Sequence, residues 1–176
     1  MKKQLLFLTF LAALATASCS KNNSATPTVK VAAKFTFRGK AYTSKKLYAS
    51  SSTTLDVLTD SAVADDNSTK VLVNFVFRKG NSDAGSYTIV GGNDNTPAAN
   101  QVALLVSETS LKNTQNVGIY TSLAGGTLVL SGSGSSFACK SPSVDLKGQY
   151  YDNTDPHNTQ ITEVSTTISA ATFTQN

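Results

Sequence analysis

The sequence predicts an all-β domain, and three observations support this fold class. Thr, Ser, Val, Tyr and Phe recur after about residue 30, and Gly and Asn interrupt them at short intervals. No long stretch keeps the apolar period of a helix. Short alternating segments between turns are typical of antiparallel sheets, so we expect a single antiparallel β-sandwich, with a lipocalin-like closed β-barrel as the alternative.

The first expected element is a β-hairpin. Residues 34–38 alternate in polarity, and Gly39-Lys40 then turns the chain into residues 41–42, because glycine tolerates a positive φ. A weaker strand is expected at residues 55–58.

The strongest strand covers residues 71–78 and should be central in the sheet. One face carries four large apolar side chains, namely Val71, Val73, Phe75 and Phe77. Leu72 and Val76 make the other face apolar too, which is typical of a strand covered on both sides.

The later strands are separated by loops at residues 81–85 and 91–100. They are expected at 87–90, 102–106, 117–121, 127–130, 144–151 and about 161–173. For 102–106 a short helix begun by Thr96-Pro97 is an alternative, but the β-branched content favours a strand. Eight to ten strands in total fit either a sandwich or a barrel.

The N-terminus has the pattern of an export signal. Lys2 and Lys3 precede an apolar run from residue 5 to 17, and small residues lead to Cys19. This run is shorter than the roughly 20 residues that a membrane-spanning helix needs. A basic start, a short apolar run and a small-residue exit indicate a secretory signal instead.

Thr16-Ala17-Ser18-Cys19 resembles the lipobox of bacterial lipoproteins. The resemblance implies cleavage before Cys19, diacylation of its thiol and anchoring in a membrane. The alternative is an ordinary signal peptide that leaves a free cysteine. We therefore expect a signal peptide at 1–18, a flexible polar tether with lipidated Cys19 at 19–29, and the all-β domain at 30–176.

The chain as a whole resembles small envelope lipoproteins of the Bacteroidota. The matching segments are the lipobox, residues 35–42, residues 85–89, residues 126–130 and residues 171–173. The resemblance implies an all-β fold and a place in the cell envelope, at the outer membrane, but no activity. Asn22 and Asn23 stand where an acidic export cluster would lie, so the inner or outer face stays open.

Charge gives no indication of a nucleic-acid partner. The signal removes two of the fifteen basic residues, which leaves 13 basic against 11 acidic residues in the mature chain. The remaining basic residues are scattered rather than clustered. The expected partner is the membrane, reached through the lipid anchor, while the ligand or protein partner is not indicated.

Candidate catalytic and metal-binding residues are sparse, so we expect no cofactor and no resident metal. The chain has a single histidine, His157, and the mature part has two glutamates. One histidine without a second nitrogen or sulfur ligand is poor for zinc. Asn- and Asp-rich loops at 65–67, 93–95 and 152–155 could offer oxygens to calcium, but turn formation explains them.

The sequence supports a specific prediction for each of four further residues. Adjacent Tyr150 and Tyr151 should lie on opposite faces of a strand, and the outward one is a candidate ligand contact. Asp60-Ser61-Ala62 resembles an O-glycosylation acceptor of exported Bacteroidota proteins, which makes Ser61 a candidate glycosylation site between strands. Cys139 has no cysteine partner in the mature chain and should be buried.

Two classes of function remain open. The first is a membrane-anchored, non-catalytic lipoprotein that acts as a binding, accessory or structural module. The second is a hydrolase with a dispersed active site around Asp152–His157. The absence of a nucleophile motif or a converging acidic pair favours the first.

Overall fold

The computed structural model describes residues 32–92, 96–133, 136–155 and 157–175, which form twelve strands and no helix. The all-β prediction is confirmed. The expected signal peptide, the tether and Cys19 lie outside the described residues. The strands are β1 (Ala33–Phe37), β2 (Lys40–Ser51), β3 (Leu55–Ala64), β4 (Thr69–Arg78), β5 (Gly85–Val90), β6 (Gln101–Ser110), β7 (Val117–Ser122), β8 (Thr127–Ser133), β9 (Ser136–Ser141), β10 (Val144–Asp152), β11 (Gln160–Ile168) and β12 (Ala171–Thr174).

The strands pair into one sheet that closes on itself. Around the ring the order is β6–β4–β3–β2–β1–β11–β10–β7, and β7 pairs again with β6. The junction between β1 and β11 is the pair of Phe37 with Ile168. Strands β5, β8, β9 and β12 extend from β6 as a branch, and β5 runs parallel to β6. The other described pairings are antiparallel.

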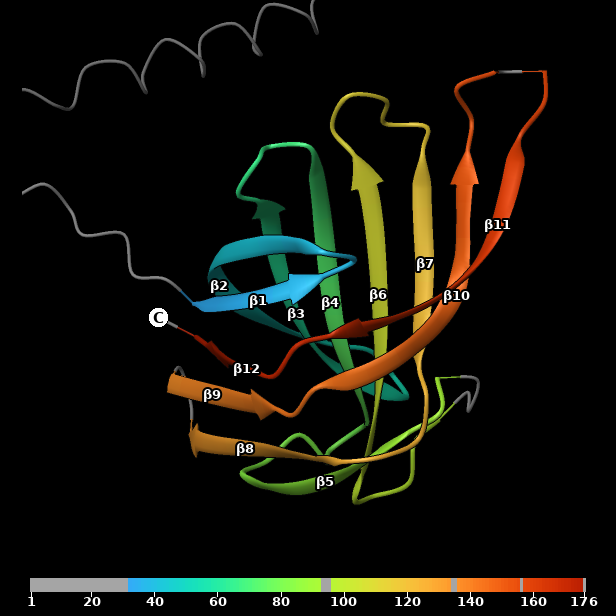
Figure 1. The fold of residues 1–176 in the computed structure, drawn as a ribbon. Coiled ribbons are helices and arrows are strands. Elements are labelled where there is room, and N and C mark those ends of the chain that lie inside the picture. The colour runs from blue at the N-terminus through green and yellow to red at the C-terminus, as the bar shows by residue number, and fades with distance from the viewer. Residues whose placement is uncertain (1–31, 93–95, 134–135, 156, 176) are drawn as a thin grey trace, which may run out of the picture.

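Figure 1 shows the strands in two crossing layers: β1, β12, β9 and β8 run across the front, while β3, β4, β6 and β7 stand upright behind them. The chain passes between the layers at three places, where β7 leads into β8, β9 into β10 and β11 into β12. The bend between β7 and β8 lies at Gly125 and Gly126, whose φ angles of 140° and 85° favour glycine. The fold therefore joins the face-to-face packing of a sandwich to a closed ring of strands.

The core lies between the layers and is rich in aromatic rings. All four predicted inward residues of β4 have no exposed surface. The Phe75 ring packs edge-on against Phe173 of β12, with centroids 5.0 Å apart. The Phe77 ring meets Tyr87 of β5 in the same way, also at 5.0 Å. The first contact ties the upright layer to the front layer, and the second ties it to β5.

Several expected elements differ from the structure. The outer face of β4 is half-exposed at Leu72 and Val76, so this central strand is buried on one face only. The expected strand at 161–173 is two strands, β11 and β12, which pair with β10 and β9 respectively. The first hairpin turns at Arg38-Gly39 rather than at Gly39-Lys40, because Phe37 pairs with Lys40.

One carboxylic acid lies inside the apolar core. Asp60 of β3 is completely buried, and its two oxygens have no hydrogen-bond partner among the described residues. Burial raises its pKa to about 6, although the nearby Ser44 hydroxyl partly offsets the rise. The buried Cys139 thiol on β9 also has a raised pKa, first because of burial and second because of the Asp60 charge. Cys139 is therefore an inert core residue, as expected.

Candidate functional site

A partly buried ion pair lies at one end of the strand ring, and its cation, Arg38, belongs to the β1–β2 turn. Arg38 and Gly39 both have positive φ angles, of 48° and 73°, which is the pattern of a two-residue type I′ hairpin turn. Glycine adopts this conformation freely, but an arginine does so at a cost of about 1 kcal/mol or more. The turn fixes the direction in which the Arg38 side chain leaves the backbone.

The Arg38 guanidinium is held on two sides. Its Nη1 donates to Glu108 Oε2 at 2.6 Å and to the Tyr120 hydroxyl at 2.9 Å. The Tyr120 hydroxyl in turn donates to Glu108 Oε2 at 3.1 Å. The guanidinium carbon lies 4.7 Å from the centroid of the Tyr150 ring, a cation–π distance. We call Arg38, Glu108, Tyr120 and Tyr150 the Arg38 site.

The sheet register explains how β6, β7 and β10 bring these residues together. Gly118 of β7 is directly opposite Glu108 on one side and Tyr150 on the other. A Cβ atom at Gly118 would lie 2.4 Å from the Tyr120 hydroxyl oxygen. The Tyr120 ring therefore occupies the space that a side chain at Gly118 would fill, and its hydroxyl reaches the ion pair.

Burial and charge act together on the ionisation of the Arg38 site. Glu108 is only 3% exposed. Burial lowers the pKa of Arg38, but the hydrogen bond and charge of Glu108 outweigh it, so that this pKa is raised. Burial, followed by the Glu108 charge, raises the pKa of Tyr120. Near neutral pH Arg38 is therefore a guanidinium and Tyr120 a neutral phenol, and a neutral phenol can still donate to Glu108.

An open cavity of about 340 Å³ adjoins the Arg38 site. Its lining is mostly cationic or hydroxylic, and consists of Arg38, Lys40, Ser68, Thr69, Glu108, Ser110, Lys112 and Tyr150. Both hydrogen bonds of the Arg38 side chain use Nη1, so Nε and Nη2 make none to the described residues. Lys40 Nζ donates to Ser68 Oγ at 2.7 Å. The cavity therefore offers N–H and hydroxyl donors beside an aromatic ring.

The two adjacent tyrosines lie on opposite faces of β10, as predicted. Tyr150 lines the cavity at the Arg38 site, and Tyr151 lines a separate groove on the outer face of the sheet. Sequence analysis did not identify Arg38 or Glu108 as site residues. The sequence did contain a signal for Glu108, since it is one of two glutamates in the mature chain and closely follows an apolar strand segment.

The loop proposed for the hydrolase alternative has the geometry of ordinary turns. Asp152 Oδ1 accepts hydrogen bonds from the Thr154 amide at 2.9 Å and its hydroxyl at 2.5 Å. Asp155 Oδ1 accepts from the His157 amide at 3.0 Å. His157 is exposed, and its imidazole forms no ion pair with a described carboxylate. Nothing in this loop orients an acid and a base toward a common point.

Ser61 lies inside strand β3 rather than between strands, so its expected position is wrong. It pairs with Leu72 of β4, is half-exposed, and lines an outer cavity with Tyr48 and Val63. The preceding Asp60 points to the other face of the strand and is completely buried. In the folded chain an enzyme could therefore not contact Asp60 and Ser61 together.

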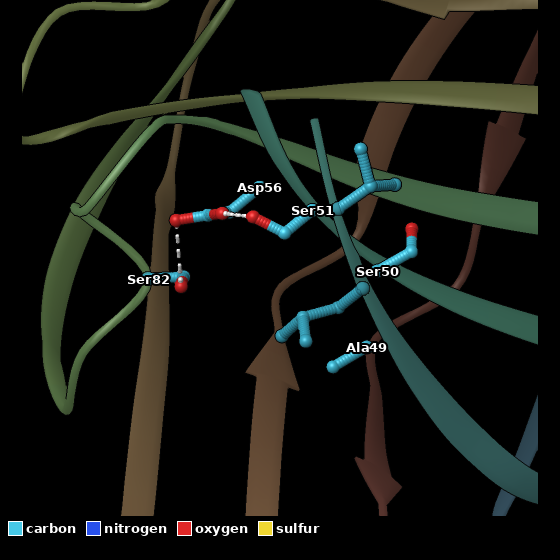
Figure 2. A pocket seen from close by; sticks show the side chains of 7 residues that line it. Ala49, Ser50, Ser51, Asp56 and Ser82 are labelled. Atoms are coloured by element: carbon cyan, nitrogen blue, oxygen red, sulfur yellow. Dashed lines mark hydrogen bonds between the residues drawn. The ribbon is translucent and has the colours of Figure 1, made fainter. Parts of the chain in front are cut away.

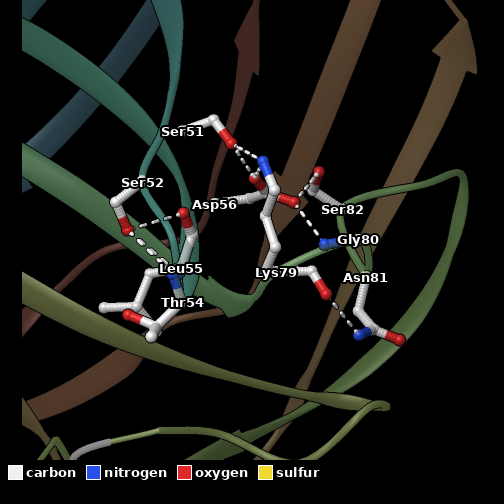
Figure 3. Close-up of polar contacts among 9 residues, drawn as sticks. All are labelled: Ser51, Ser52, Thr54, Leu55, Asp56, Lys79, Gly80, Asn81 and Ser82. Atoms are coloured by element: carbon white, nitrogen blue, oxygen red, sulfur yellow. Dashed lines mark hydrogen bonds and ion pairs between the residues drawn. The ribbon is translucent and has the colours of Figure 1, made fainter.

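A second polar cluster surrounds Asp56, at the edge of a shallow cavity of about 260 Å³ that is shown in Figure 2. Its Oδ1 accepts from Ser51 Oγ at 2.5 Å and from Lys79 Nζ at 3.3 Å. Its Oδ2 accepts from the Gly80 amide at 2.7 Å and from Ser82 Oγ at 3.3 Å. Figure 3 shows how these bonds join the β2–β3 turn to the loop after β4. The Ser51 hydrogen bond is the main reason why the pKa of Asp56 is lowered, and the satisfied carboxylate serves as a structural link.

Within the described residues, no three His, Cys, Asp or Glu side chains are grouped so that they could hold a metal ion. The same residues contain no helix long and apolar enough to cross a membrane. No protein-family model, curated protein or solved structure matches the chain.

Proposed function

We propose that this protein is a lipid-anchored, non-catalytic binding module of the bacterial cell envelope, which takes a small ligand with one anionic group at the Arg38 site. The observation that carries the proposal is a fixed arginine with unused N–H donors beside an open cavity. Glu108, Tyr120 and Tyr150 hold the guanidinium in place, so little side-chain entropy is lost when a ligand binds.

The charges around the cavity match a ligand with a single negative charge. Arg38, Lys40 and Lys112 supply three cations, and Glu108 supplies one carboxylate. Asp66 supplies a second carboxylate, because Ser68 hydrogen bonds and then the Lys40 and Lys112 charges lower its pKa. One positive charge therefore remains uncompensated. The planar edge of a guanidinium binds a carboxylate or a phosphate oxygen pair with two parallel hydrogen bonds.

The size and openness of the cavity favour a small polar molecule. A volume of about 340 Å³ lies at the lower end of the range for ligand pockets. Ser68, Thr69 and Ser110 add hydroxyl groups to the wall, which could bond to the body of the ligand. The amphipathic Tyr150 ring gives the site one flat side.

Binding is tested by NMR titration of the lipidated mature chain in detergent micelles, with acetate, glucuronate, inorganic phosphate and uncharged glucose as probes. We expect an anion to shift the signals of residues around Arg38 and Lys112, and glucose to leave them unchanged. Arg38→Lys keeps the charge but loses the planar fork, so affinity should fall at least about tenfold. Arg78→Gln, at an exposed arginine, is the matched control.

Two results would contradict this function. One is that none of the anions shifts these signals. The other is that Arg38→Lys and Lys112→Gln bind as well as the wild type. Lys112 is exposed and makes no described hydrogen bond to the ion pair, so its substitution tests the cavity without disturbing the fold.

The anchor is tested separately at Cys19. We expect Cys19→Ala to abolish incorporation of an alkyne-palmitate label and to leave an unprocessed or soluble protein, since the thiol is the acylated group. Cys139→Ala is the matched control, because Cys139 is buried and should leave labelling unchanged. A Cys19→Ala chain that loses its signal and still stays with membranes after a carbonate wash would rule out this anchor.

A further inference from the structure

We propose that the outer face of the sheet carries a second binding site, for a neutral, hydroxyl-rich ligand such as a segment of a glycan chain. The site is the groove of about 440 Å³ beside Tyr151, called here the outer groove. Tyr151, Gln149 and Glu163 line it on β10 and β11, and Ile119 and Leu123 line it on the side of β7. It lies on the face of β10 opposite to the Arg38 site, so it is independent of the function proposed above.

The polar side chains of the outer groove are already aligned by hydrogen bonds. The Tyr151 hydroxyl donates to Gln149 Oε1 at 2.7 Å, and Gln149 Nε2 donates to Glu163 Oε1 at 2.5 Å. Gln149 and Glu163 are directly opposite each other on β10 and β11. This series of hydrogen bonds orients both donors and acceptors. Such an arrangement suits sugar hydroxyls, because each hydroxyl can donate and accept.

The apolar part of the outer groove is exposed to solvent. Ile119 is 50% exposed and Leu123 is 47% exposed, and the half-buried Tyr151 belongs to β10, the strand that pairs with β7. An aromatic face carries partial negative charge, so it attracts the weakly positive C–H groups of a sugar ring. A surface that mixes aligned polar groups with aliphatic and aromatic side chains matches the two sides of a pyranose.

The charges of the outer groove favour a neutral ligand over a second protein. Lys147 and Glu163 contribute one charge of each sign to the lining, so the groove is neutral overall. The described hydrogen bonds leave the Lys147 ammonium and the second Glu163 oxygen without partners. A flat apolar protein surface would bury both charges at a substantial desolvation cost, whereas sugar hydroxyls can satisfy them.

The test is a calorimetric and NMR titration of the lipidated mature chain in detergent micelles with neutral hexasaccharides of glucose, xylose and mannose. An oligogalacturonate serves as the charged comparison. We expect at least one neutral chain to shift the signals around Tyr151 and Gln149. Tyr151→Ala should weaken binding at least tenfold, and Tyr151→Phe should retain most of it because the ring is kept. Tyr48→Ala, at a tyrosine 53% exposed on β2, is the matched control.

Gln149→Leu provides a second variant that leaves the ring in place, and it should also weaken binding. Thermal unfolding of each variant checks that the fold is intact. The proposal is overturned if no neutral chain shifts these signals, or if only the oligogalacturonate does. It is equally overturned if the wild type self-associates through this face and Tyr151→Ala removes that association. Arg38→Lys should bind the neutral chains normally, which separates this site from the Arg38 site.

Discussion

Replacing Asp60 with asparagine is expected to make the protein more stable than the wild type above about pH 6, and the advantage should disappear in acid. Asp60 is completely buried and no described group donates a hydrogen bond to its carboxyl. An isolated buried charge is costly, so the folded state keeps the proton more tightly than the unfolded chain.

The sign and size of this effect follow from the pKa. Burial raises the pKa of Asp60 from 3.8 to about 6 in the folded protein. The folded chain therefore binds more protons between these values, and its stability falls as the pH rises through the folded pKa. The stabilisation of the folded state by proton binding at Asp60 is complete below the unfolded pKa and is lost above about pH 6. A shift of this size corresponds to about 3 kcal/mol.

The measurement is urea unfolding of wild type and Asp60→Asn at about pH 4 and about pH 7.5. The free energy of unfolding of the variant, minus that of the wild type, should grow by about 2–3 kcal/mol between these conditions. Taking the difference removes the pH dependence of the other carboxylates, such as Asp56. Asp83→Asn, at an exposed aspartate, is the control. A difference that stays constant with pH would mean that Asp60 ionises like an exposed carboxyl.

Phe75→Ala is expected to cost about 3–5 kcal/mol of folding free energy. The ring has no exposed surface, and it packs edge-on against Phe173 at 5.0 Å, so its removal leaves a cavity between the two layers. β3 and β6 pair with β4 on both sides, so the backbone around the cavity has little freedom to collapse.

Urea unfolding of Phe75→Ala and of Ile161→Ala compares a core position with an exposed one. Ile161 is 58% exposed, so its substitution should change stability by less than about 0.5 kcal/mol. A midpoint for Phe75→Ala that equals the wild-type midpoint would contradict the packing of β4 against β12.

The fold class could be predicted because it depends on local patterns. Val71, Val73, Phe75 and Phe77 alternate with less buried residues, and this alternation alone identifies a strand with an inward face. The opposite placement of Tyr150 and Tyr151 follows from the same period. Local patterns also located the first hairpin, although the turn is one residue earlier, because Arg38 adopts the positive φ that glycine would normally supply.

Other features depended on contacts between distant residues and left no local pattern. Aspartate is a residue type common in turns, and only the pairing of β3 with β2 and β4 places Asp60 in the core. The division of residues 160–174 into β11 and β12 reflects pairing with two different strands, β10 and β9. A single continuous strand and a bent one have nearly the same alternation, so the sequence could not distinguish them.

The order of neighbouring side chains was enough to identify most strand-forming segments and the inward residues of the central strand, and it predicts an export and lipidation signal that ends at Cys19. The meeting of Arg38, Glu108 and Tyr150 depends on the tertiary structure, since 70 positions separate Arg38 from Glu108, and the three residues lie in the β1–β2 turn, on β6 and on β10. Closing the sheet from β6 round to β7 is what brings them to one end of the ring, and that closure is set by long-range pairing rather than by local sequence.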